Sequence, residues 1–90
     1  MPRLSGLSEP VPPLLLLTRP ECGLCEEFEA GLAALARECP LPPVHKVDVD
    51  SDPVLRRRYG LDIPVLLWGG AVVCRHRLDR DELLRLLRAR

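Results

Sequence analysis

The chain has 90 residues, of which 47% are hydrophobic and only 3% aromatic, and its 13 basic residues balance its 13 acidic residues. Ninety residues make one small domain, whose core must be built mainly from leucine, valine and alanine. A net charge of zero excludes nucleic-acid or membrane-surface binding driven by bulk charge.

Residues 1–13 contain four prolines and are predicted to be a disordered tail in front of a single domain at residues 14–90. This stretch is too rich in proline for the core of a signal peptide. The apolar run Leu14–Leu17 is far too short to span a membrane. We therefore expect a cytoplasmic protein, whose four cysteines do not form a structural disulfide framework because that compartment keeps thiols reduced.

The first half of the domain predicts a strand, a helix and a second strand. Leu14–Thr18 is a short apolar run, typical of a strand buried on both faces. Residues 19–25 open a long helix that ends by Pro40. Val44–Asp50 alternates between apolar and polar residues and is predicted to be the second strand. The apolar stripe of the helix is Cys25, Phe28, Leu32, Leu35 and Cys39.

A short helix follows and ends near Tyr59, with Asp52 as its N-cap, Pro53 at its first position and Gly60 as its C′ residue. Gly69 and Gly70 separate two apolar runs, 65–68 and 71–76. Glycines supply the positive φ of a tight turn, so these runs predict a hairpin.

The last helix begins after Asp79, which is its expected N-cap, and Glu82 completes a pattern like a capping box. Leu78 is placed to pack onto Leu83 across the helix start. The resulting order is β-α-β-(short α)-β-β-α. It gives an α/β domain with a parallel first half and an antiparallel hairpin, and therefore a mixed four-stranded sheet flanked by helices.

Cys22-Gly23-Leu24-Cys25 is the motif that carries chemistry. Thiol–disulfide exchange needs one thiolate to attack and a second thiol to close the disulfide, and residues three apart at a helix start are neighbours. Unpaired N–H groups and the helix dipole favour the thiolate of Cys22. Cys25 lies on the apolar stripe, so we expect Cys22 to be the exposed nucleophile and Cys25 the buried resolving thiol.

Zinc binding is the structural alternative for this pair. A tetrahedral site usually takes two closely spaced ligand pairs, and neither Cys39, Cys74, His45 nor His76 forms a second pair in the sequence. No metal ligand is therefore assigned. Cys39 and Cys74 are expected to be small packed residues without a redox role.

The order and spacing of several short motifs resemble the glutaredoxins, in particular the short bacterial glutaredoxin-like proteins, from about Leu14 to the C-terminus. The landmarks are the segment from Arg19 to Cys25, Val47-Asp48-Val49-Asp50, Tyr59-Gly60, Ile63-Pro64-Val65-Leu66 and the capped last helix. This resemblance implies a thioredoxin-like fold. It also implies a dithiol–disulfide oxidoreductase, with protein disulfides or mixed disulfides as partners and glutathione as a possible co-substrate.

By the same resemblance, Pro64 is a cis-proline lying against the two cysteines, and the backbone of Ile63 pairs with an extended substrate. Arg19 occupies the basic position just ahead of the active cysteine, where it serves the glycyl carboxylate of glutathione. These three residues are the predicted substrate-binding residues.

The chain departs from glutaredoxins in two places. Gly23-Leu24 replaces the usual Pro-Tyr between the cysteines, and the stretch from Arg75 to Leu78 replaces the glycine-rich approach to the γ-glutamyl carboxylate of glutathione. We therefore expect weak glutathione binding and a protein disulfide as the better substrate. Thioredoxins differ more, since Leu16 stands where they bury an aspartate.

Two classes of function remain open at this point. The first is the dithiol–disulfide oxidoreductase, expected to act as a monomer without a bound cofactor. The second is a non-catalytic thioredoxin-fold module that binds a partner, a metal or a cluster. Both cysteines and the Ile63-Pro64 step favour the enzyme, because a scaffold needs none of them.

Overall fold

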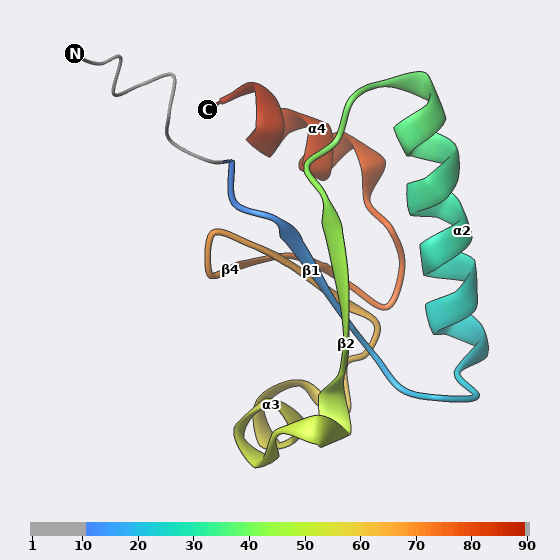
Figure 1. The fold of residues 1–90 in the computed structure, drawn as a ribbon, viewed down its shortest axis with the longest axis vertical. Coiled ribbons are helices and arrows are strands. Elements are labelled where there is room, and N and C mark those ends of the chain that lie inside the picture. Colours follow the sequence, from blue (N-terminus) through green and yellow to red (C-terminus); the bar gives the residue numbers. More distant parts are fainter. Residues whose placement is uncertain (1–10, 90) are drawn as a thin grey trace.

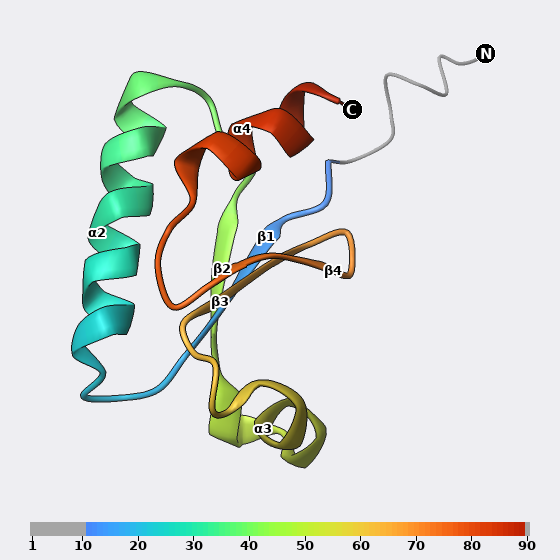
Figure 2. The same cartoon turned by 180° about the vertical axis from the view of Figure 1, so that it is seen from behind.

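The computed structural model describes residues 11–89, which form a four-stranded sheet with helices on both faces (Figures 1 and 2). β1 pairs with β2 in parallel, whereas β3 pairs antiparallel with both β1 and β4, in the order β2-β1-β3-β4. The predicted mixed sheet is therefore confirmed. The strands are β1 (Leu14–Thr18), β2 (Val44–Asp48), β3 (Val65–Trp68) and β4 (Ala71–Arg75).

Among residues 11–89, two α-helices and one turn of 3-10 helix connect the strands, and a third α-helix follows β4. They are α2 (Gly23–Glu38), η1 (Val49–Ser51), α3 (Pro53–Tyr59) and α4 (Arg80–Arg88). Within residues 11–89, no helix has the length and apolar composition needed to cross a membrane. Residues 1–10, where most of the predicted tail falls, lie outside the described part of the chain.

The core has two parts, one on each face of the sheet, because successive residues of a strand point to opposite faces. Leu16 packs with α2 and α4, whereas its neighbour Leu17 packs with α3. Both leucines are almost fully buried, as expected for a central strand. The first cluster is Leu14, Leu16, Phe28, Leu32, Leu35, Leu66, Val73 and Leu83, and the second is Leu17, Val49, Val65 and Leu67.

The predicted strand 44–50 was two residues too long, because β2 ends at Asp48. The Asp48 carboxylate accepts a hydrogen bond of 2.9 Å from the N–H of Asp50, which turns the chain into η1. The side chain of Asp50 therefore leaves the strand register. This turn positions Asp50 beside the candidate site.

Two other expectations need correction. Gly60 ends α3 with φ −57°, so it is not a left-handed C′ residue. A Cβ at Gly60 would stand 2.5 Å from the carbonyl oxygen of Arg56, so close approach of the backbone explains the glycine. β4 ends at Arg75 rather than at His76, whose positive φ of 69° ends the strand.

The hairpin confirms the role predicted for its two glycines. Gly69 and Gly70 have φ of 58° and 84°, the left-handed values that a type I′ turn needs. Beside this turn, Trp68 ends β3, and its indole N–H donates a 2.9 Å hydrogen bond to the carbonyl of Pro12. The segment in front of β1 is thereby attached to the hairpin.

The predicted N-caps of α3 and α4 are also confirmed, but the capping-box pattern expected at α4 is wrong, because the Glu82 carboxylate accepts from Arg85 and the N–H of Asp79 donates to the sulfur of Cys74. Asp52 accepts from the N–H of Val54 at 2.7 Å, and Asp79 accepts from the N–H of Glu82 at 3.0 Å. Each cap satisfies a backbone donor that the helix itself leaves free.

Replacing Asp79 with alanine is expected to lower the free energy of unfolding by about 1 kcal/mol, because the N–H of Glu82 loses its acceptor. Urea unfolding followed by circular dichroism measures this change. Asp81→Ala is the matched control, since it removes the same charge from the first turn of α4 and leaves the cap in place. Equal losses in the two variants would show that charge, rather than the cap, stabilises the helix start.

Candidate functional site

Cys22 and Cys25 are joined by a disulfide at the start of α2, with their Cα atoms 5.2 Å apart. Cys22 is the N-cap residue of this helix, and its sulfur accepts a hydrogen bond of 3.2 Å from the N–H of Cys25. The sulfur therefore lies where the helix concentrates unpaired donors and positive potential.

The two cysteines differ in exposure. Cys25 is 2% exposed and lies on the buried face of α2 with Phe28, whereas Cys22 is half-buried and open to solvent. Leu24, between them, is 45% exposed. The structure therefore places the two sulfurs as the sequence predicts, while their roles as nucleophile and resolving thiol stay predictions.

A pocket of about 330 Å³ opens beside the disulfide, and both cysteines line it. Its walls come from the end of β1, the start of α2 and the outer strand β2. Two cations line it, Arg19 and Lys46. The other charged lining residues are Glu21, Glu26, Glu29 and Asp48.

Arg19 holds a carboxylate of the protein itself. Its Nε donates to Oδ2 of Asp50 at 2.7 Å and its Nη2 donates to Oδ1 at 2.9 Å, while Nη1 stands 3.4 Å from the carbonyl oxygen of Gly60. The hydrogen bonds from Arg19 keep the pKa of the Asp50 carboxyl below its usual range. Asp50 therefore stays ionised, and the pair persists at neutral and mildly acidic pH.

Ile63 and Pro64 lie in the loop before β3, and the peptide bond between them is cis. Pro64 is buried, and its carbonyl oxygen accepts a 2.8 Å hydrogen bond from the N–H of His76. The side chain of Arg75 lies 3.4 Å from Asp62, the residue before Ile63. The end of β4 therefore holds this loop by two contacts. Substrate binding by Ile63 and Pro64 stays a prediction.

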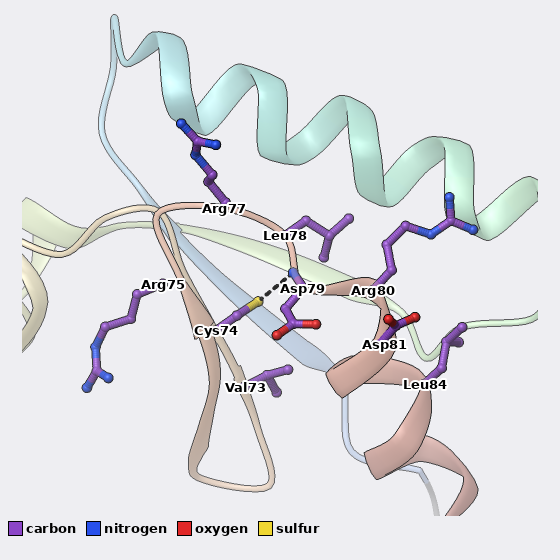
Figure 3. Close-up of a pocket in the computed structure, with 9 residues that line it drawn as sticks. All are labelled: Val73, Cys74, Arg75, Arg77, Leu78, Asp79, Arg80, Asp81 and Leu84. Carbon is purple, nitrogen blue, oxygen red and sulfur yellow. Dashed lines mark hydrogen bonds between the residues drawn. The ribbon is translucent and has the colours of Figure 1, made fainter.

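A larger pocket lies elsewhere, between β4 and the start of α4, with a volume of about 910 Å³ (Figure 3). It is an open surface hollow that neither cysteine of the disulfide lines. Figure 3 shows Arg75 and Arg77 extending to opposite sides of the chain. Two backbone donors at the start of α4 are already in use, because Asp79 donates to the sulfur of Cys74 and Glu82 donates to Asp79.

Cys39 and Cys74 are free thiols, each half-buried beside the first core cluster. Cys39 is the C-cap of α2, and its thiol donates to the carbonyl of Leu35 at 3.6 Å. Burial raises the pKa of the Cys74 thiol. Among residues 11–89, no group of three or more histidine, cysteine or acidic side chains is placed to hold a metal ion.

Because its pKa is raised, Cys74 is expected to react slowly with iodoacetamide at pH 7 and to reach half its maximal rate only above the usual range of cysteine thiols. Burial disfavours the thiolate, which is the reactive form. Peptide mass spectrometry across a pH series measures this rate in the oxidised protein, where the disulfide protects Cys22 and Cys25. A plateau reached by pH 8 would contradict the raised pKa.

Sequence reasoning missed Asp50 as the partner of Arg19 beside the disulfide. Asp50 is 31 residues away from Arg19, and their contact follows from the parallel pairing of β1 with β2 together with the turn at η1. The Asp48-Val49-Asp50 pattern was a usable signal, because an aspartate two residues ahead of a free N–H favours a turn over continued strand.

Residues 13–88 match the glutaredoxin-like domain family (DUF836). No curated protein matches the chain significantly. A solution NMR structure of a protein from Nitrosomonas europaea is 26% identical, covers 89% of this chain and 94% of its own, and superposes with a TM-score of 0.74. An X-ray structure of a protein from X. campestris is 31% identical, covers 86% and 97% of the two chains, and has a TM-score of 0.63.

Thioredoxins share the same fold with lower TM-scores. The thioredoxin of Fasciola hepatica is 22% identical, with a TM-score of 0.55, over 96% of this chain and 86% of its own. The predicted thioredoxin-like fold is therefore confirmed. The match over residues 13–88, the similarity to the X. campestris protein and the Cys22–Cys25 pair agree with one another, and the chain belongs to the glutaredoxin-like domain family.

Proposed function

We propose that this protein is a thiol–disulfide oxidoreductase that acts through Cys22 and Cys25. In the reduced protein, the Cys22 thiolate attacks one sulfur of a substrate disulfide, forms a mixed disulfide and releases the other substrate sulfur as a thiolate, which takes up a proton. Cys25 then loses its proton and attacks the Cys22 sulfur. This releases the second substrate thiol and leaves the Cys22–Cys25 disulfide, so two electrons pass to the substrate.

The observation that carries the proposal is the unequal exposure of two sulfurs at one helix start. Cys22 can meet a substrate from solvent, whereas Cys25, at 2% exposure, can react only with the neighbouring sulfur. This arrangement favours resolution of the mixed disulfide within the protein over release to a second thiol. A half-exposed Leu24 beside Cys22 adds apolar surface for a partner chain.

We propose a protein disulfide as the substrate, with glutathione only as a weak co-substrate. Recognition of glutathione by the family pattern needs backbone donors at the start of the last helix, and here Cys74 and Asp79 accept two of them. The bulky stretch from Arg75 to Leu78 replaces the glycines that would let a tripeptide backbone approach. An extended protein segment needs neither feature.

The test is turnover of a protein disulfide, such as that of insulin, by a dithiol reductant with catalytic amounts of the protein. We expect turnover well above the uncatalysed rate, and the same turnover from Cys39→Ser, a matched control that removes a thiol far from the pair in sequence. Purified protein that carries zinc or a cluster and shows no turnover would support the binding module instead.

A further inference from the structure

Arg19 connects three segments that are distant in sequence. It follows β1, it pairs with Asp50 after β2, and it reaches the carbonyl of Gly60 at the end of α3. It also lines the pocket beside the disulfide, three residues ahead of Cys22. This position would suit Arg19 to bind a negatively charged group of a substrate.

The guanidinium of arginine has two edges that can each grip a carboxylate with two parallel N–H groups. The first edge, Nε with Nη2, already grips both oxygens of Asp50 at 2.7 and 2.9 Å. The second edge, Nη1 with Nη2, has its Nη1 facing the Gly60 oxygen at 3.4 Å. A second carboxylate therefore meets an arginine whose charge is already paired with Asp50 and whose Nη1 already has an acceptor.

The other cation of the pocket is also paired. The Nζ of Lys46 stands 3.3 and 3.4 Å from the two carboxylate oxygens of Glu29, on the facing side of α2. The remaining charged residues that line the pocket are all acidic: Glu21, Glu26 and Asp48. A thiol that carries its own carboxylate meets acids here and two cations that are already neutralised.

We propose that Asp50 sets the charge preference of the disulfide site. By pairing with Arg19, it reduces the attraction of that cation for thiols and disulfides that carry a carboxylate close to the reacting sulfur. Neutral and basic partners are therefore favoured. Asp50 acts through Arg19 and is therefore a positioning residue. The inference rests on the proposed thiol–disulfide exchange and names the substrate class of that same site.

The experiment follows reduction of the Cys22–Cys25 disulfide by two small thiols, which are compared at equal thiolate concentration. One is 3-mercaptopropionate, which carries a carboxylate, and the other is 2-mercaptoethanol, which is neutral. Two thiols give up two electrons and become one disulfide, and the protein gains two cysteine thiols, which are trapped by alkylation and counted by mass spectrometry. The measured quantity is the ratio of the rate with 3-mercaptopropionate to the rate with 2-mercaptoethanol.

In Asp50→Ala this ratio is expected to rise about fivefold over wild type, which corresponds to the upper range of the energy measured for exposed ion pairs. The rise should become smaller in 1 M salt, which screens the charge of Arg19. Asp50→Asn, which keeps the shape of the side chain, should shift the ratio in the same direction, and it replaces the alanine variant if that variant fails to fold. Arg19→Met combined with Asp50→Ala should remove the rise.

Glu82→Ala is the control, because it also removes the carboxylate of a bidentate ion pair with an arginine. Arg85 donates to the two oxygens of Glu82 at 2.8 and 2.9 Å, on α4 and outside the pocket. The ratio in Glu82→Ala should equal that of wild type. The proposal would be overturned if this ratio in both Asp50 variants equalled the wild-type ratio within error. It would also be overturned if the ratio fell strongly in Arg19→Met alone, because Arg19 would then already bind anionic thiols in the wild-type protein. Failure of 2-mercaptoethanol itself to be oxidised by the wild-type disulfide would instead overturn the proposed exchange.

Discussion

Replacing Cys22 with serine is expected to reduce turnover of a protein disulfide to the uncatalysed rate. A serine hydroxyl stays protonated at neutral pH and forms no mixed disulfide, so the first bond of the proposed exchange cannot form. The insulin assay with a dithiol reductant measures the loss. A folded Cys22→Ser variant that retained more than a tenth of the wild-type rate would show that another thiol attacks.

Cys25→Ser is the informative partner variant. Cys22 can still attack, but nothing inside the protein displaces the substrate, so a mixed disulfide with Cys22 should accumulate and appear by mass spectrometry. Its mass identifies the bound partner directly. If the adduct formed on Cys25 in Cys22→Ser instead, the two roles would be reversed, in spite of the 2% exposure of Cys25.

The second large effect is on stability. Leu66→Ala is expected to lower the free energy of unfolding by about 2–5 kcal/mol, because Leu66 is fully buried in the first core cluster, opposite Leu16 on β1. In a domain of this size, the melting temperature should fall by roughly 10–30 °C. Thermal unfolding followed by circular dichroism measures both.

Leu61→Ala is the matched control, since the same atoms are removed from a side chain that is 97% exposed. It should change the stability by less than about 0.5 kcal/mol. Comparable destabilisation by the two substitutions would mean that burial in this structure does not describe the packing of the protein in solution.

Features that depend on a few neighbouring residues were predictable from the sequence. The hairpin needed only two adjacent glycines between apolar runs, and the caps needed only an aspartate ahead of each helix. The pairing of Cys22 with Cys25 at the start of α2 was predictable because the two residues are three positions apart and Cys25 lies on the apolar stripe of the helix. In each case the physical cause lies within about one helical turn or one β-turn of the chain.

Features that depend on tertiary placement were not predictable in the same way. Arg19 was expected to be available to a ligand, and its pairing with Asp50 required knowing that β2 stops at Asp48 and turns. The left-handed backbone of His76, which ends β4 one residue early, has no glycine or proline to announce it. The residues around the disulfide were therefore identifiable from sequence, but the partners that already occupy them were not.

The single tryptophan of the chain lies at the far end of the sheet from the redox pair. Trp68 is paired with Leu14 at the start of β1, whereas Cys22 follows the opposite end of that strand, and the five residues of β1 alone separate the two ends by about 13 Å. A disulfide quenches indole fluorescence only at close range. We therefore expect the emission of Trp68 to report the folding of the sheet and the attachment of the Pro12 segment, and to change little when the cysteines change their oxidation state. Fluorescence is then expected to follow the unfolding of both redox forms on one common scale.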